Sequence, residues 1–218
     1  MKYLYLLFTA SIISLSGCSQ NSKKSKVSNE PPAKEIKAGG RCEDCTAIYE
    51  SSTAFEQLKE VDTLPDYNEP GPKIEISGII YQHDGKTPAS NVVLYIYHTD
   101  QQGLYSKRGK EKGRHGYIRG WIKTNANGFY KFYTLIPASY PNSNNPKHIH
   151  PIIKEPGISE YWIEEFLFDD DLLLPAQERT KANPRGGSGI LKTELKEGQL
   201  KATRNIILGL NVSDYPDK

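Results

Sequence analysis

The sequence predicts an all-β domain built as a β-sandwich. Short runs of apolar and β-branched residues recur between residues 74 and 210, and signals for turns separate most of them. No long segment with helical periodicity lies between these runs, so the strands are expected to pair with one another. Hydrophobic residues make up 37% of the 218 residues, which is compatible with one packed core. The formal net charge of +2 gives no reason to expect a nucleic-acid partner.

The first residues have the pattern of an export signal. Lys2 precedes a short apolar stretch, residues 4–13, and a Leu-Ser-Gly-Cys motif that resembles a bacterial lipobox ends at Cys18. This resemblance implies a signal peptide over residues 1–17 and a lipid on the Cys18 sulfur. The apolar stretch is shorter than the ~20 residues of a membrane-spanning helix. We therefore expect a lipoprotein of the cell envelope, anchored to the outer membrane.

The region between the lipid and the domain contains two further cysteines. Residues 18–38 are expected to be a flexible membrane tether, because Ser, Asn, Lys and Pro dominate them. Residues 39–73 form an N-terminal extension with Cys42 and Cys45 in a Cys-x-x-Cys motif. A zinc site would need a second cysteine pair, which the sequence lacks. Outside the cytosol we expect a disulfide that pins the start of the domain, with no role at an active site.

The sandwich domain is expected to span residues 74–212, after a weak helical pattern at residues 46–60. Strands are predicted over residues 74–81, 92–97, 117–124, 129–135, 147–153, 161–168 and 204–210. The run at 92–97 is apolar throughout, which is typical of a strand covered on both faces. Two long loops, residues 100–116 and 175–189, interrupt the series, and we expect them to determine specificity.

The clearest chemistry lies between Tyr140 and His150. His148 and His150 are separated by one residue, so they point to the same face if the segment is a strand. Two imidazoles on one face provide half of a metal site. A loop rich in Pro and Asn precedes them, with Tyr140 at its head. Taken alone, a His-x-His pair is more often a surface feature than a pair of ligands.

The order of motifs along the domain is more specific than this pair. Tyr105 ends a Gly-Leu-Tyr sequence after the strand that leads to His98, Tyr140 ends Pro-Ala-Ser-Tyr, and His-Ile-His follows. A Trp-Ile-Glu-Glu-Phe-Leu-Phe segment at residues 162–168 and an Arg-Asn-Ile-Ile-Leu strand at residues 204–208 come next. This succession resembles the catalytic domain of the intradiol ring-cleavage dioxygenases, the catechol and protocatechuate 3,4-dioxygenase type. The resemblance implies the β-sandwich of that domain.

The resemblance also implies a cofactor and a reaction. In that family two tyrosinates and two histidines hold a non-haem Fe(III) ion, and the matching positions here are Tyr105, Tyr140, His148 and His150. Such an enzyme inserts O2 into a catechol-like aromatic diol and gives a product of the cis,cis-muconate type. Tyr140 would leave the metal when the diol binds and accept a proton. The phenols, with a pKa near ~10, must lose their protons to bind the metal.

One position departs from the family pattern. The family has arginine three residues before the first histidine, where it stabilises charge on the substrate, and this chain has Asn145. Asparagine can donate a hydrogen bond but carries no charge. Arg114 and Arg119 are the alternative sources of charge that the sequence offers. The departure keeps a second function open, a non-catalytic, membrane-tethered binding module with a vestigial metal site. The complete set of two tyrosines and two histidines favours the enzyme.

Overall fold

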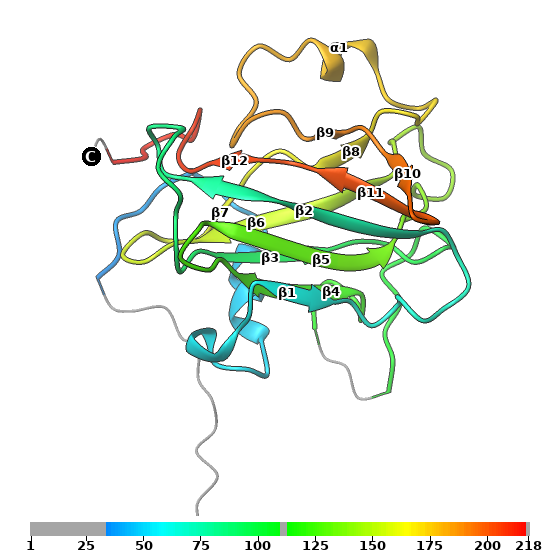
Figure 1. The fold of residues 1–218 in the computed structure, drawn as a ribbon, viewed down its shortest axis with the longest axis horizontal. Coiled ribbons are helices and arrows are strands. Elements are labelled where there is room, and N and C mark those ends of the chain that lie inside the picture. The colour runs from blue at the N-terminus through cyan, green and yellow to red at the C-terminus, as the bar shows by residue number, and fades with distance from the viewer. Residues whose placement is uncertain (1–33, 110–112, 217–218) are drawn as a thin grey trace, which may run out of the picture.

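The fold is a sandwich of two mixed β-sheets (Figure 1). The computed structural model describes residues 34–109 and 113–216, so Cys18, the expected signal peptide and most of the expected tether lie outside the described residues. The two sheets pack face to face, and the larger hydrophobic core lies between them. The predicted all-β sandwich is therefore confirmed. Within the described ranges, no helix has the length and apolar character that crossing a membrane requires.

The first sheet has the order β1-β5-β2-β11-β10, and β12 also pairs with β2. Its strands are β1 (Val61–Thr63), β2 (Lys73–Tyr81), β5 (Phe129–Leu135), β10 (Glu194–Lys196), β11 (Gln199–Thr203) and β12 (Ile206–Ile207). Burial alternates along β2 and along most of β5, because successive side chains point to opposite faces of a sheet. Ile76 lies opposite Phe132 in the antiparallel pair, and both side chains are fully buried in the core.

The second sheet has the order β4-β3-β6-β8-β9, and β7 also pairs with β6. Its strands are β3 (Val93–Tyr97), β4 (Arg119–Lys123), β6 (His148–Lys154), β7 (Tyr161–Trp162), β8 (Phe166–Phe168) and β9 (Ile190–Leu191). In β3, Leu94 and Ile96 join the core between the sheets, whereas Val93 and Tyr95 join a second cluster on the outer face. The expectation that this strand is covered on both faces is confirmed.

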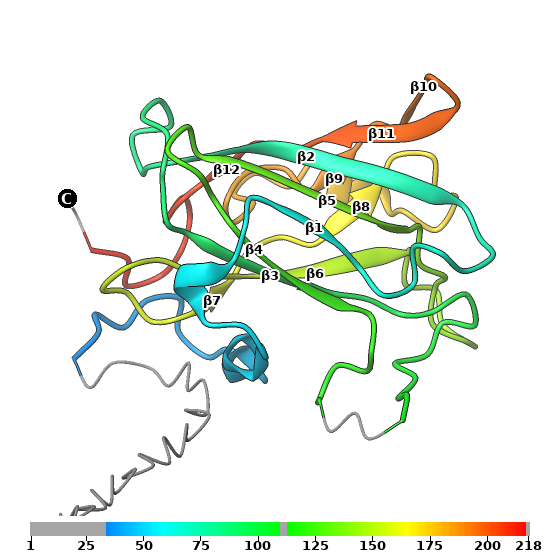
Figure 2. The same cartoon turned by 60° about the horizontal axis from the view of Figure 1, so that its bottom comes forward.

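The N-terminal extension covers that outer face. It forms two short 3-10 helices, η1 (Cys45–Glu50) and η2 (Phe55–Gln57), instead of the single helix that the pattern at residues 46–60 suggested. That prediction was wrong because the Ser51 hydroxyl accepts a hydrogen bond from the Thr53 amide at 3.2 Å, a local bond that competes with a continuous helix. The extension then contributes β1, which pairs in parallel with β5 (Figure 2).

The C-terminal third differs most from the predicted strands. The run at 161–168 splits into β7 and β8, because the first pairs with the far end of β6 and the second pairs with its beginning. The run at 204–210 is reduced to the two residues of β12, and the loop at 175–189 contains a short helix, α1 (Ala176–Arg179). The β10–β11 hairpin was not predicted. Its turn residues Glu197 and Gly198 both have positive φ, a geometry that Asn-Gly signals more strongly in sequences.

Candidate metal centre

Strand β6 places both histidines of the His-x-His motif on the outer face of the second sheet. Ile149 and Ile153 point into the core between the sheets, so the alternating positions point outward. His148 and His150 therefore share a face with Ile152, which belongs to the outer hydrophobic cluster. The Lys147 amide immediately before the strand donates to the Asp171 carboxylate at 2.7 Å and fixes where β6 begins.

Four side-chain donor atoms meet at this face. The hydroxyl oxygens of Tyr105 and Tyr140 lie 2.6 Å apart. The Tyr140 hydroxyl oxygen lies 3.1 Å from Nε2 of His148 and 3.2 Å from Nε2 of His150. The two Nε2 atoms are themselves 3.0 Å apart. The structure thus brings together all four residues that the sequence nominated as metal ligands, although they come from segments up to 45 residues apart.

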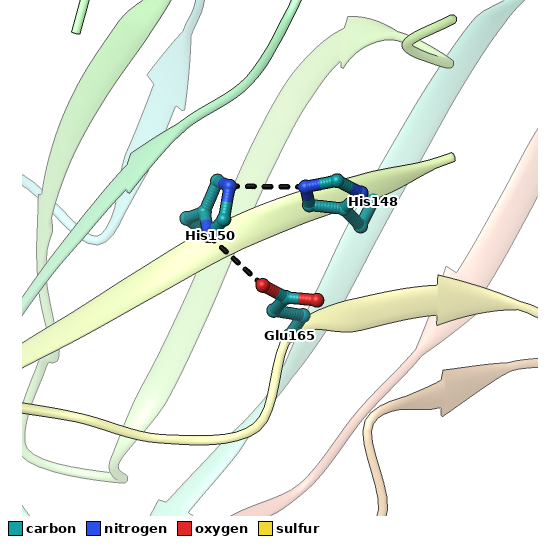
Figure 3. A group of neighbouring side chains, drawn as sticks. All are labelled: His148, His150 and Glu165. Atoms are coloured by element: carbon teal, nitrogen blue, oxygen red, sulfur yellow. Dashed lines mark hydrogen bonds and ion pairs between the residues drawn. The ribbon is translucent and has the colours of Figure 1, made fainter. Parts of the chain in front are cut away.

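The second nitrogen of each imidazole identifies the tautomer. Nδ1 of His148 lies 2.7 Å from the Pro146 carbonyl oxygen, and Nδ1 of His150 lies 3.1 Å from Oε1 of Glu165 (Figure 3). Both acceptors require a proton on Nδ1, so either ring, in its neutral form, directs an unprotonated Nε2 toward the other. Two lone pairs at 3.0 Å repel unless a proton or a cation lies between them. This orientation is the usual one for histidines that bind metals.

Glu165 was not identified from the sequence as a site residue. It follows β7 at the entrance to β8, and no spacing signal separates it from Glu164 beside it. Its carboxylate groups with the two histidines as a set of possible metal donors, all within 4.8 Å of one another. Burial raises the pKa of this carboxyl group, but the hydrogen bond and positive potential of His150 outweigh that effect and hold the pKa below its usual value.

The loop after β3 positions Tyr105 through a compact turn around Asp100. The Asp100 carboxylate accepts hydrogen bonds from the Leu104 amide at 3.0 Å and the Ser106 hydroxyl at 2.6 Å. Gly103 lies within this turn with φ of 77°, and a side chain there would collide with the Ser139 carbonyl oxygen. Glycine therefore allows the Tyr105 loop to approach the segment that carries Tyr140.

Burial determines the protonation of the donor groups when no metal is bound. Burial raises the pKa of the Tyr105 phenol, and its hydrogen bond with Tyr140 raises that pKa further. Burial also raises the pKa of Tyr140 and lowers the pKa of His148. Without a cation both phenols therefore keep their protons and His148 is neutral at neutral pH. A metal that displaced the two phenolic protons would receive two anionic oxygens and two imidazole nitrogens, and the residues fit Fe(III).

Stacked aromatic rings fix the orientation of His150. The Tyr97 ring stacks on the His150 ring at a centroid distance of 4.6 Å, and the His115 ring stacks on Tyr97 at 3.6 Å. Nδ1 of His115 forms a 3.0 Å hydrogen bond with the Tyr95 hydroxyl. His115 lies in a polar loop, where the sequence contains no signal that distinguishes it from an exposed residue. His98 instead bonds to Thr134 at 2.6 Å, and it is absent from the residues that line the cavity at the site.

A cavity of about 800 Å³ opens from the histidines toward solvent. Tyr140 and Asn145 line it, whereas Tyr105 is not among the lining residues. Cys42 and Cys45 are joined in a disulfide and also line the cavity. The expected disulfide is present, and its position in the cavity wall was not predicted. The N-terminal extension folds back over the outer face of the second sheet, a contact between distant segments that local sequence does not reveal.

The two arginines considered as substitutes for the missing charge lie elsewhere. Arg114 donates to the Glu50 carboxylate at 2.9 Å, and Arg119 pairs with the same carboxylate. Neither lines the cavity, so that expectation was wrong. Among the described residues, the Lys and Arg side chains in the lining are Arg41 and Lys181. Nζ of Lys181 already lies 2.6 Å from the Glu164 carboxylate.

Comparisons with known proteins find similarity to catechol 1,2-dioxygenases in both sequence and fold. Catechol 1,2-dioxygenase 2 of Acinetobacter lwoffii is 27% identical over 151 residues, which are 55% of this chain and 54% of that protein. The catechol 1,2-dioxygenase of Acinetobacter sp. ADP1 has the same fold, with a TM-score of 0.54 and 19% identity over 74% of this chain and 61% of that one. The chain spans about half the length of the curated relative it matches.

In a second structure the match covers a larger share of the other chain. The intradiol ring-cleavage dioxygenase of Tetranychus urticae has a TM-score of 0.51 and 18% identity, over 74% of this chain and 89% of that one. The sequence profile of the family described as Dioxygenase matches residues 46–196, more than half of the chain and all four converging donor residues. The chain therefore belongs to the intradiol dioxygenase family.

Proposed function

We propose that this protein is a non-haem Fe(III)-dependent intradiol dioxygenase that cleaves the ring of a catechol-like diol with O2. The observation that carries the proposal is the convergence of two phenol oxygens and two imidazole nitrogens, with contacts of 2.6 to 3.2 Å around the Tyr140 hydroxyl. Membership of the intradiol dioxygenase family supports the same reaction class. The ligands in this proposal are Tyr105, Tyr140, His148 and His150.

Each ligand residue has a distinct part in the proposal. Fe(III) at this site would accept the two oxygens of the diol and draw electron density from its ring, which makes the ring reactive toward O2. His148 and His150 sit on a central strand and are held through their Nδ1 atoms, so they suit permanent ligands. Tyr105 is not among the residues that line the cavity, so substrate has less access to it, and it suits the same role.

Tyr140 suits the ligand that exchanges with substrate. It comes from a loop, is half-buried and lines the cavity, so a diol can reach its hydroxyl oxygen. As a phenolate it would accept a proton from one diol hydroxyl and move away from the histidines. Burial favours the protonated phenol, since it raises the pKa of Tyr140, and so stabilises the displaced form. Asn145, exposed at the cavity, can donate an amide hydrogen bond to the substrate but supplies no charge.

Oxygen consumption tests the proposed reaction. Protein loaded with Fe(III) should consume O2 when given catechol, hydroxyquinol or protocatechuate, and the product should have the ultraviolet absorption of a cis,cis-muconate. His148→Ala should abolish uptake because it removes a ligand from the rigid strand. Leu195→Ala, at an exposed position of the first sheet, is the control and should leave uptake unchanged. Failure of the iron-loaded protein to consume O2 with any diol in a broad panel contradicts the enzyme.

A binding module with a vestigial metal site is the second candidate. The observation that favours it is the uncharged Asn145 at the cavity, where Lys181 is already paired with Glu164 and cannot freely replace an arginine. In this case the protein would bind iron and a diol without consuming O2. Anaerobic titration of the iron-loaded protein with catechol, beside the uptake assay, distinguishes the two functions.

Attachment to a membrane is a further part of the proposal. It rests on the motif that ends at Cys18, which resembles a lipobox. Several acyl chains on this residue would hold the protein stably at the outer membrane, because a single chain binds only weakly. Radiolabelled palmitate fed to expressing cells should label the wild-type protein and not Cys18→Ala. Equal labelling of the two proteins contradicts this anchor.

A further inference from the structure

The cavity at the metal centre extends well beyond the space that a single diol ring needs. Its volume of about 800 Å³ falls in the range of pockets that enclose drug-sized ligands, roughly 300–1,000 Å³. Three of the four metal donors, Tyr140, His148 and His150, are among its lining residues. The walls beyond them come from the N-terminal extension around Cys42, from Trp162 on β7 and from the loop before α1, including Pro175. The chain has therefore built a second compartment beside the place where the reacting ring would bind.

Trp162 gives this compartment a flat aromatic wall. It lies opposite Ile152 in the β6–β7 pair, and Ile152 is two residues beyond His150 on the same face of β6. Directly opposite residues of an antiparallel pair point to the same face of the sheet. Trp162 is therefore a diagonal cross-strand neighbour of His150, at roughly 7–8 Å for such a pair. It is 38% exposed and lines the cavity.

The tryptophan is held in place by its neighbours. The Arg185 guanidinium lies over the Trp162 ring at 3.7 Å from its centroid. The same guanidinium donates to the Gly39 carbonyl oxygen at 3.2 Å, and Arg185 is only 8% exposed. The Arg185 contact thus links the aromatic wall to the start of the N-terminal extension. A ring that is fixed before binding loses little conformational entropy when a ligand stacks on it.

Among the described residues, the charged side chains that line the cavity are four acidic ones and two basic ones: Glu43, Glu164, Glu165 and Glu178, and Arg41 and Lys181. Lys181 lies 2.6 Å from Glu164 and 3.6 Å from Glu178, while Glu165 faces His150 at 3.1 Å. Two further side chains of opposite sign, Arg41 and Glu43, are both exposed at the rim. No excess of positive charge remains among the lining residues to bind a carboxylate. The compartment therefore disfavours an anionic substituent on the substrate.

We propose that the substrate is a catechol that carries a neutral aromatic substituent, and that this substituent stacks on Trp162. The inference rests on the proposed function, because the diol must bind at the metal donors for its substituent to reach the tryptophan. It narrows the substrate class from any aromatic diol to diols with at least one further ring. The disulfide between Cys42 and Cys45 also belongs to the lining of the cavity.

Anaerobic calorimetry with three probes tests this inference by binding, without turnover. The probes are catechol, 3,4-dihydroxybiphenyl and protocatechuate, each added to the full iron-loaded chain. We expect the biphenyl to bind about tenfold more tightly than catechol, the effect of one good aromatic contact. Protocatechuate, whose substituent is anionic, should gain nothing over catechol. Equal affinities for catechol and the biphenyl, or tightest binding by protocatechuate, would overturn the proposal.

Variants of the tryptophan separate stacking from a general effect on the fold. Trp162→Ala should reduce biphenyl affinity about tenfold and leave catechol affinity within about twofold, while Trp162→Phe should retain most of the preference. Leu195→Ala, 72% exposed on the first sheet, is the control and should behave as wild type. Equal losses for both diols in Trp162→Ala would contradict stacking.

The results also separate this inference from the proposed reaction. Tight, Trp162-dependent binding of the biphenyl without O2 consumption supports the compartment and rejects the catalytic function. Consumption of O2 with catechol, combined with equal affinities for the two neutral diols, supports the catalytic function and rejects the compartment.

Discussion

The Tyr140 hydroxyl oxygen lies close to the other three donor atoms of the metal centre. It lies within 3.2 Å of one phenol oxygen and two imidazole nitrogens. Each histidine is oriented through its Nδ1 atom, His148 by a backbone carbonyl and His150 by a carboxylate. A backbone acceptor cannot be removed by substitution, but the carboxylate of Glu165 can. The contribution of orientation to metal binding can therefore be measured at His150.

Removal of the Glu165 carboxylate should weaken Fe(III) binding without removing a ligand. Glu165→Ala leaves Nδ1 of His150 without its partner at 3.1 Å, so the ring loses its fixed tautomer and direction. We expect a loss of about 10–100-fold in Fe(III) affinity, measured by competition with a chelator. Glu165→Gln keeps an acceptor oxygen and should lose less.

Glu194→Ala provides the matched control, since that side chain is exposed on β10 and pairs with Lys196. It should bind iron as wild type does. An affinity in Glu165→Ala equal to that of the control contradicts a role for Glu165 in positioning His150.

At the scale of elements, a buried polar network connects β3, β5 and the loop before β2. The Thr134 hydroxyl of β5 lies 2.6 Å from Nε2 of His98 and 3.0 Å from the Asp66 carboxylate. Nδ1 of His98 donates to the Thr99 carbonyl oxygen at 2.8 Å. All three network residues are almost completely buried. The Thr134 hydroxyl thus bridges the His98 imidazole and the Asp66 carboxyl group, both of which are shielded from water.

Thr134→Val should destabilise the protein by about 2–4 kcal/mol, because it leaves polar atoms of His98 and Asp66 buried without their partner. The measurement is the free energy of unfolding from urea titration. Thr203→Val is the matched control at an exposed strand position and should change that free energy by less than about 0.5 kcal/mol. Equal unfolding free energies for the two variants contradict the importance of the network.

The network also predicts a pH dependence. Burial lowers the pKa of His98 from 6.5 to about 4. The neutral His98 side chain therefore makes its full contribution to the free energy of unfolding above pH 6.5, and this contribution falls as the pH drops toward 4. Burial raises the pKa of Asp66 from 3.8 to about 6, so its contribution is complete below pH 3.8 and falls as the pH rises toward 6. Between pH 4 and 6, the contribution of His98 to the free energy of unfolding therefore rises with pH while that of Asp66 falls, and the two changes partly cancel in the wild type.

Asp66→Asn removes the pH dependence that Asp66 contributes to stability and keeps the one that His98 contributes. Its free energy of unfolding should therefore fall more steeply than that of the wild type as the pH drops from 6.5 to 4, in urea titrations across that range. Asp170→Asn, at an exposed carboxylate paired with Lys147, is the control and should follow the wild type. Parallel pH profiles for Asp66→Asn and the wild type would contradict the opposing pH dependences that we assign to Asp66 and His98.

At the scale of the whole molecule, the site is assembled from segments that are distant in the chain. The sandwich supplies a rigid strand for the histidines, loops at its edge supply the tyrosines, and the N-terminal extension closes the outer face. Nε1 of Trp121 donates to the Ile48 carbonyl oxygen at 2.7 Å and fastens η1 to β4. The Cys42–Cys45 disulfide lies at the beginning of this helix and in the cavity wall.

The fold and the histidine pair were accessible from the sequence because their signals are local. Alternation reveals β2 and β5, and a spacing of two residues places His148 and His150 on one face. Tyr105 and Tyr140 could be nominated only through the order of family motifs, since neither spacing nor composition distinguishes them from the other tyrosines in the chain. The iron that the four residues would bind remains a prediction.

Other parts of the site depend on pairing between distant segments. Glu165 reaches His150 because β7 and β8 pair with opposite ends of β6, which splits a run that reads as one strand. The cysteine pair reaches the cavity only through packing of the N-terminal extension on β3 and β6. Neither contact leaves a periodic or spacing signal, so sequence reasoning missed both.

The most direct test of the central claim is the visible spectrum of the iron-loaded protein. Phenolate ligands on Fe(III) should give a wine-red colour from charge transfer, and Tyr105→Phe and Tyr140→Phe should each shift or weaken the band. Tyr67→Phe, whose hydroxyl accepts a hydrogen bond from Gln199 at 2.9 Å in the first sheet, should leave it unchanged. A colourless iron-loaded protein, or a band that neither ligand variant alters, would contradict the proposed metal centre.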